Sequence, residues 1–163
     1  SRVIKFYFDP ISPYAYFAKE AMKRTFPKDV LKNNIVYKPV LFAGLLNHHK
    51  QLGPAEIELK RIFTYEYTSW VAHKHGYPFK FPVNHPFNPL PLLRGCIAAK
   101  STSEAVDDIL QFVWKDGKPA TKEFEKDLLH LFETKYNVKP EDFSSADVKN
   151  ELRSNGEEAV KEG

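Results

Sequence analysis

The sequence has a single cysteine, Cys96, among its 163 residues. One thiol excludes a disulfide within the chain and an internal dithiol redox pair. So little cysteine is typical of reducing compartments, so we expect an intracellular, cytoplasmic protein. No run approaches the roughly 18 apolar residues that span a bilayer, and the N-terminal sequence lacks an apolar block behind a basic one. Neither a membrane partner nor a signal segment is therefore expected.

An excess of one charge is also missing. The chain has 24 basic and 21 acidic side chains, and its net charge of +3 is spread along the sequence, so we expect no binding of nucleic acid. The seven glycines form no phosphate-binding loop. The histidine pairs, His48 with His49 and His73 with His75, do not have the spacing of metal ligands. Nucleotide cofactors and metals are therefore not expected.

What the chain does contain is enough apolar sequence for one compact domain, 42% of its residues. VIKFYF predicts a buried strand over residues 3–8, which ends at an Asp-Pro pair. Ser12 then stands where a helix cap is expected, with Pro13 at the first helical position. A helix over 14–26 and an extended segment over 35–44 follow. Strand, helix and strand in this order indicate a βαβ unit with parallel strands.

Helical patterns dominate the rest of the chain. A long helix is predicted over 54–76, and the segment 77–91, with its five prolines, predicts a shaped loop. Further helices are predicted over 90–100, 103–114 and 122–136 and after Ser144, and a break is predicted at Asn155 and Gly156. Two parallel strands alone would leave an unusually small sheet with exposed edges. We therefore expect further strands beyond Gly163.

The start of the first helix is the place where an anion is expected. The first turn of a helix leaves N–H groups without partners, and the helix dipole adds partial positive charge. Ser12 adds a hydroxyl at this position. From spacing alone, a serine that merely caps the helix is the commoner case.

Five stretches together resemble the 2-hydroxychromene-2-carboxylate isomerases, which are related to kappa-class glutathione transferases and DsbA-like proteins. They are FDPISPYAYFA, KPVLFAGLL, GPAEIELKRIFTYEY, FPVNHPFNPLP and RSNGEEAVKEG. The resemblance implies an α/β thioredoxin-like fold with a helical insertion domain. Residues 1–45 would be the N-terminal βαβ part, 46–150 the helical insertion, and 151–163 a truncated return to the thioredoxin-like domain. A segment with a cis-proline and two more strands would follow, and these strands are missing from this chain.

The resemblance also implies a role for Ser12. Thioredoxin-like oxidoreductases carry Cys-x-x-Cys at this helix start, where this sequence has Ser12, Pro13, Tyr14 and Ala15. A helix start that lowers a cysteine pKa can instead hold the thiolate of glutathione, with the Ser12 hydroxyl donating to the sulfur. The implied activity is glutathione-dependent isomerisation of 2-hydroxychromene-2-carboxylate or a related aromatic degradation intermediate. The thiolate would add to a conjugated carbon, the resulting single bond would rotate, and the sulfur would leave.

An aromatic carboxylate substrate calls for a cation. Arg94 is favoured over Lys60 and Arg61, although each is more commonly a solvated surface charge. Asn88 either binds a ligand or braces its loop, and Tyr14 either faces the cleft or packs in the core. An ordinary polar loop is the alternative for the candidates between 47 and 51. The expected contacts to glutathione are Ser12, Pro13, Tyr14, Gln51 and Asn88, and those to the substrate are Asn47, His49 and Arg94.

Two other functions remain open from the sequence. A kappa-like transferase would use the same thiolate site to conjugate or reduce electrophiles, and a non-catalytic thioredoxin-like module would only bind. Because related proteins dimerise through the helical insertion, the resemblance also implies a homodimer.

Overall fold

The computed structural model describes residues 2–163. Strands β1 (Ile4–Phe8) and β2 (Ile35–Pro39) form a two-stranded parallel sheet, with Ile4 opposite Ile35 and Phe8 opposite Pro39. Helix α1 (Pro13–Thr25) connects them, followed by the short helix α2 (Lys28–Asn33). The predicted βαβ unit with parallel strands is confirmed.

The second extended segment is shorter than predicted. It ends at Pro39, and residues expected to continue it form helix α3 (Phe42–His48) instead. The physical reason is a contact between residues far apart in the sequence. The buried carboxylate of Asp9 accepts the N–H of Phe42 at 2.9 Å. This bond satisfies an N–H of the first turn of α3 and so favours a helix start there.

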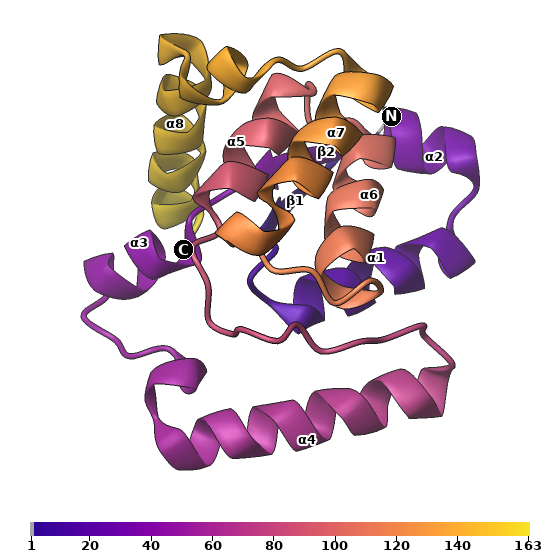
Figure 1. The fold of residues 1–163 in the computed structure, drawn as a ribbon, viewed down its shortest axis with the longest axis vertical. Helices are drawn as coiled ribbons and strands as arrows, with labels where there is room; N and C mark the ends of the chain where they lie inside the picture. Colours follow the sequence, from indigo (N-terminus) through magenta and orange to yellow (C-terminus); the bar gives the residue numbers. More distant parts are fainter. Residues whose placement is uncertain (1) are drawn as a thin grey trace.

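Figure 1 shows the long helix α4 (Glu58–His75) set apart from the other helices, with residues 77–89 running between it and α1. A 3-10 turn, η1 (Pro54–Glu56), precedes α4, and Gly76 ends it in the left-handed conformation at φ 65°. No regular helix or strand forms over 77–89, so the shaped loop is confirmed. The remaining elements are α5 (Leu90–Ala98), α6 (Ser103–Trp114), η2 (Lys122–Phe124), α7 (Glu125–Tyr136), η3 (Pro140–Ser144) and α8 (Ala146–Glu162).

Helix α8 is continuous, so the predicted break at Asn155 and Gly156 is wrong. Asn155 is buried, and its side-chain amide donates to the carbonyl oxygen of Pro39 at 3.0 Å. This tertiary bond outweighs the weak helix propensity of an Asn-Gly pair. A single helix therefore crosses residue 150, where the helical insertion was expected to end.

Glu158 fastens the second half of α8 to the sheet. Its carboxylate lies 2.5 Å from Lys5 Nζ on β1 and 3.0 Å from Lys38 Nζ on β2, and it accepts the Tyr7 hydroxyl at 2.9 Å. Hydrogen bonds from Lys5, then Lys38 and Tyr7, lower the pKa of Glu158 to about 2.

The core is centred on α6. Its inward face is fully buried and ends in Trp114, which has no exposed surface. It packs with apolar residues of α1, α5 and α7, such as Phe17, Leu92 and Phe132. Burying one such side chain stabilises the fold by about 1.5–3 kcal/mol. Within residues 2–163, no helix is long and apolar enough to cross a membrane.

Candidate active site

The junction between β1 and α1, residues 9–12, presents Ser12 at the start of α1. The backbone of Ser12 has the extended conformation of a cap residue, φ −95° and ψ 122°, but its side chain accepts no N–H from the helix. Ser12 is thus the N-cap residue of α1 and Pro13 the first helical residue, as predicted, but the side-chain hydrogen bond of a serine cap is absent. The N–H of Ala15 instead bonds to the Ser12 carbonyl at 3.1 Å, and Pro13 has no N–H. The half-buried hydroxyl is not used by its own helix.

Asp9 holds the junction from within. Its Oδ1 accepts the N–H of Ile11 at 3.0 Å, and its carbonyl accepts the N–H of Ser12 at 3.0 Å. Burial raises the pKa of Asp9 to about 6, against the two backbone hydrogen bonds to Ile11 and Phe42. The same carboxyl group therefore ties the start of α3 to the start of α1.

Two further side chains take the carbonyl oxygens of the junction. The indole Nε1 of Trp114 donates to the Pro10 carbonyl at 2.8 Å, and His85 Nε2 lies 2.8 Å from the Ile11 carbonyl oxygen. Both carbonyl oxygens are therefore held by side chains, one from the fully buried Trp114 and one from the half-buried His85. Sequence reasoning missed His85 and Trp114. The available signal was that a buried tryptophan needs an acceptor for its N–H.

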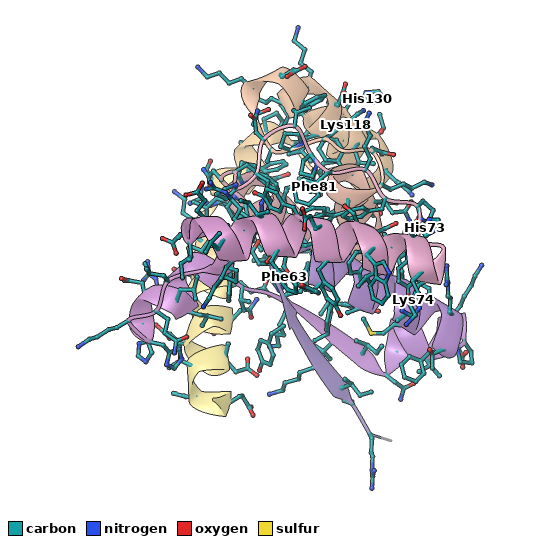
Figure 2. All side chains as sticks on the ribbon, turned by 90° about the horizontal axis from the view of Figure 1, so that it is seen from below. Phe63, His73, Lys74, Phe81, Lys118 and His130 are labelled. Carbon is teal, nitrogen blue, oxygen red and sulfur yellow. The ribbon has the colours of Figure 1, made fainter. Side chains whose placement is uncertain are left out.

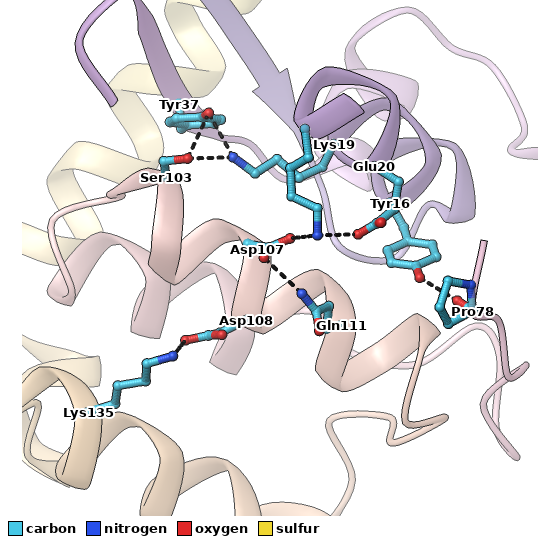
Figure 3. Close-up of polar contacts among 11 residues, drawn as sticks. Tyr16, Lys19, Glu20, Tyr37, Pro78, Ser103, Asp107, Asp108, Gln111 and Lys135 are labelled. Atoms are coloured by element: carbon cyan, nitrogen blue, oxygen red, sulfur yellow. Dashed lines mark hydrogen bonds and ion pairs between the residues drawn. The ribbon is translucent and has the colours of Figure 1, made fainter. Parts of the chain in front are cut away.

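The body of α1 is fixed by polar contacts to its neighbours (Figure 3). The buried Lys19 donates from Nζ to the Tyr37 hydroxyl at 2.8 Å and to Ser103 Oγ at 2.6 Å. Burial lowers the pKa of Lys19 to about 8. Lys23 pairs with Asp107 of α6 at 2.8 Å, and the Tyr16 hydroxyl donates to the Pro78 carbonyl. The helix that presents Ser12 is thereby held against β2, α6 and the 77–89 loop.

Tyr14 projects from the first turn of α1, with 46% of its surface exposed, whereas Pro13 is buried. The Tyr14 ring meets Phe17 edge to face at 6.3 Å. Partial burial raises the pKa of Tyr14, and Tyr67 of α4 adds to the effect. Tyr14 therefore lies on the surface of α1 and is not a core residue.

The polar candidates at and after the end of α3 lie on the surface. Asn47, His49 and Gln51 are all exposed, and the His49 ring contacts His48 edge to face. Across residues 2–163, no hydrogen bond joins the side chains of these three residues to Ser12. The structure therefore shows no direct link between them and the junction.

Asn88 and Arg94 lie at and after the end of the 77–89 loop. Asn88 Oδ1 accepts the N–H of Leu90 at 3.1 Å, so this residue braces the start of α5. Arg94 is half-buried on α5, and its Nε has no hydrogen-bond partner among the described residues. Arg61 donates to the Ala55 carbonyl at 3.4 Å, and Lys60 is exposed. Among residues 2–163, the Nε of Arg94 is thus a buried donor without an acceptor.

Cys96, the single cysteine, is not a reactive thiol. Cys96 is fully buried in α5, and burial raises its pKa to about 12. Its sulfur stays protonated at neutral pH and is no nucleophile. Among the described residues, no three His, Cys, Asp or Glu side chains come together as a metal site.

The family of DSBA-like thioredoxin domains matches residues 3–163. The chain belongs to this family. Among curated proteins, glutathione S-transferase kappa 2 of Caenorhabditis elegans is 32% identical over 177 aligned residues, covering 99% of this chain and 77% of the relative. A solved structure of 2-hydroxychromene-2-carboxylate isomerase has a TM-score of 0.75 at 18% identity, covering 98% of this chain and 79% of that one. The resemblance found in the sequence and the thioredoxin-like fold are both confirmed. The two proteins named, a transferase and an isomerase, are enzymes.

Proposed function

We propose that the protein is a glutathione-dependent isomerase of 2-hydroxychromene-2-carboxylate or a related aromatic degradation intermediate. The observation that carries this proposal is the Ser12 hydroxyl, which stands at the start of α1 and is not used by its own helix. The carbonyl oxygens of the two preceding residues are bonded to Trp114 and His85. The likeness of the fold to a chromene isomerase structure supports the same function.

Ser12 would hold the glutathione sulfur by donating its hydroxyl hydrogen. A hydrogen bond to a charged group contributes about 1.5–3 kcal/mol, and the partial positive charge at the start of α1 adds to it. When bound, glutathione supplies a thiolate that adds reversibly to a conjugated carbon, so that a double bond becomes free to rotate. The rigid attachment of α1 keeps the Ser12 hydroxyl in place for this role.

The remaining contacts are also proposals. Pro13 and Tyr14 adjoin Ser12, and Gln51 and Asn88 would contact the tripeptide. Because Asn88 Oδ1 is engaged by Leu90, its amide N–H groups are the ones that would donate. For the substrate carboxylate, we propose Asn47, His49 and Arg94.

The test follows both substrate and thiol. Purified protein is mixed with 2-hydroxychromene-2-carboxylate and a small amount of glutathione, and the geometric isomers are separated by chromatography while free thiol is titrated. Interconversion of many equivalents of substrate with no loss of thiol supports the isomerase. No interconversion, with glutathione present in excess, contradicts it. Protein without glutathione serves as the control.

A kappa-like transferase is the second candidate. One observation favours it: the kappa-class relative is 32% identical, whereas the isomerase with the similar fold is 18% identical. With glutathione in excess in the same assay, loss of one thiol for each molecule conjugated, or of two for each molecule reduced as glutathione disulfide forms, would show this activity. A third candidate, a non-catalytic binding module, is favoured if glutathione neither reacts nor raises the melting temperature.

We also propose that a second copy of the chain covers α4. The outer face of this helix carries Leu59, Phe63 and Trp70, exposed to 80%, 63% and 52%. Figure 2 views α4 from outside, with Phe63 and Lys74 labelled on it. In an antiparallel pair of α4 helices, Phe63 of one copy would meet Trp70 of the other, and Glu58 would approach Lys74. Such a symmetric contact would remove the apolar side chains of this face from water, with the exposed Glu66 lying between Phe63 and Trp70.

The oligomeric state decides this part of the proposal. Light scattering after size exclusion should give the mass of a dimer for the wild type and of a monomer for Phe63→Glu. Val83→Glu is the matched control, because Val83 is 70% exposed but lies on the 77–89 loop. A monomeric wild type contradicts the proposed dimer.

A cytoplasmic location remains a prediction. Its support is chemical, because a site that needs glutathione as a thiol operates in a reducing compartment. Fluorescence microscopy of the tagged natural protein would test it, and signal confined to an oxidising compartment would contradict it.

A further inference from the structure

His85 contacts the junction from the 77–89 loop. Its Nε2 lies 2.8 Å from the carbonyl oxygen of Ile11, the residue before Ser12. A carbonyl oxygen can only accept, so Nε2 carries the hydrogen and donates. In the neutral ring Nδ1 is then an acceptor. The Tyr65 hydroxyl of α4 lies 3.0 Å from Nδ1 and also donates to the His85 carbonyl oxygen at 2.9 Å, so its one hydrogen is shared between these two acceptors. The Ile11 carbonyl oxygen therefore fixes the tautomer of His85, and Tyr65 holds the residue in place.

Aromatic rings enclose the imidazole. They lie at centroid distances of 5.5 to 6.1 Å and belong to Phe81, Trp114, Tyr65 and Phe87. Burial lowers the pKa of His85, an effect larger than the rise caused by its bond to Ile11. The ring is therefore mainly neutral near pH 7, with few orientations open to it.

The bond to His85 fixes the direction of one peptide group. The peptide between Ile11 and Ser12 is a rigid plane, in which the carbonyl oxygen and the N–H point in opposite directions. His85 holds the oxygen, and the Asp9 carbonyl accepts the Ser12 N–H at 3.0 Å. If this plane turned, the oxygen would present negative charge toward the start of α1, where it would repel a bound anion.

We propose that His85 is a positioning residue for Ser12, which holds the Ile11 carbonyl away from the anion site at the start of α1. The chemical part of this inference rests on the proposed function, because the anion in question is the glutathione thiolate. The geometric part does not, because the bonds that His85 makes are present without a ligand. The two parts have separate measurements.

The experiment compares His85→Leu with His85→Gln. Leucine fills a similar volume without a donor, whereas the amide of glutamine can donate from near the position of Nε2. We expect His85→Leu to lower kcat with glutathione about tenfold or more near pH 7, since misplacement by about 1 Å can cost on the order of 100-fold. The pH of half-maximal rate should rise in the same variant, because the thiolate form of bound glutathione is less favoured. His85→Gln should restore most of kcat and of the wild-type pH of half-maximal rate, although the glutamine side chain does not titrate.

Amide hydrogen exchange measures the geometric part without glutathione. The N–H groups of Ile11 and Ser12 both bond to Asp9, and their exchange should accelerate in His85→Leu but not in His85→Gln. The proposal is overturned if the two amides exchange no faster in His85→Leu than in the wild type. It is also overturned if they exchange faster but the pH profile of the glutathione-dependent rate in an active His85→Leu enzyme is unchanged. Should His85→Leu fail to fold, His85→Asn replaces it, because its shorter amide does not reach the Ile11 oxygen.

A wild type without any glutathione-dependent rate contradicts the proposed function separately. In that case the exchange of the two amides alone decides whether His85 positions the junction. Faster exchange in the leucine variant then supports the positioning role, and unchanged exchange overturns it.

Discussion

Replacing Ser12 by alanine should separate chemistry from stability in this protein. Ser145 provides the matched control, because both serines stand at the start of a helix but only Ser145 accepts a helix N–H, that of Val148 at 3.3 Å. Ser145→Ala should lower the free energy of unfolding by about 1 kcal/mol, the usual cost of a lost cap. Ser12→Ala removes no such bond and should change it by less than about 0.5 kcal/mol.

The effects on activity should be reversed. A hydrogen bond to a thiolate contributes about 1.5–3 kcal/mol. At about 1.4 kcal/mol for each factor of ten, Ser12→Ala should lower the rate with glutathione about 10- to 150-fold. The thiol pKa of bound glutathione should rise by about 1 to 2 units for the same reason. Ser145→Ala should leave both quantities unchanged.

The assays are urea unfolding and the pH dependence of the glutathione-dependent rate, run on both variants. The rate profile gives the pKa of the bound thiol, and unfolding gives the stability. Two results would refute the reasoning: an unchanged rate in Ser12→Ala, or a loss of stability in Ser12→Ala as large as that in Ser145→Ala. The first would remove the hydroxyl from the mechanism, and the second would show that it acts as a cap.

Three further predictions concern titratable groups. The folded-state pKa of Asp9 is raised to about 6, so above about pH 4 the folded state binds more protons than the unfolded state. The free energy of unfolding should therefore fall by up to about 3 kcal/mol as the pH rises from 4 to 6. Asp9→Asn should flatten this pH dependence, as measured by urea unfolding. For Glu158, the folded-state pKa is lowered to about 2, so the sign is opposite. Its contribution to the free energy of unfolding is complete above about pH 5 and is lost as the pH falls toward 2. Glu158→Gln should therefore lower the urea midpoint near pH 7 but hardly at all near pH 2. Cys96, with a pKa raised to about 12, should resist iodoacetamide in the folded protein and react once the protein is unfolded, as mass spectrometry would show; rapid labelling of the folded protein would contradict its burial.

Much of the fold could be predicted because its signals are local. The strand-helix-strand order, the long helix near 54–76 and the proline-rich loop all follow from short patterns, and the structure confirms them. The errors have one cause, namely tertiary bonds between distant residues. Asp9 favours a helix start at Phe42 where a strand was predicted, and the bond from Asn155 to Pro39 keeps α8 intact across an Asn-Gly pair.

The site was predictable only in part for the same reason. Ser12 could be found because a hydroxyl at a helix start is visible in sequence. Its alternative role as a side-chain cap could be tested only from coordinates, because a cap depends on one hydrogen bond. His85 and Trp114 could not be assigned to the junction, since nothing in the sequence places a loop and the end of α6 beside residues 10 and 11.

The attachment of the junction to Trp114 has a consequence for how variants of this protein are interpreted. Trp114 lies 104 positions away from Pro10 in the chain, at the end of helix α6, where sequence alone indicates only a core-packing role. A random-mutagenesis survey should therefore find that changes at this position lower activity as damage to Ser12 does, but, unlike Ser12→Ala, also lower stability, because Trp114 is a fully buried core residue.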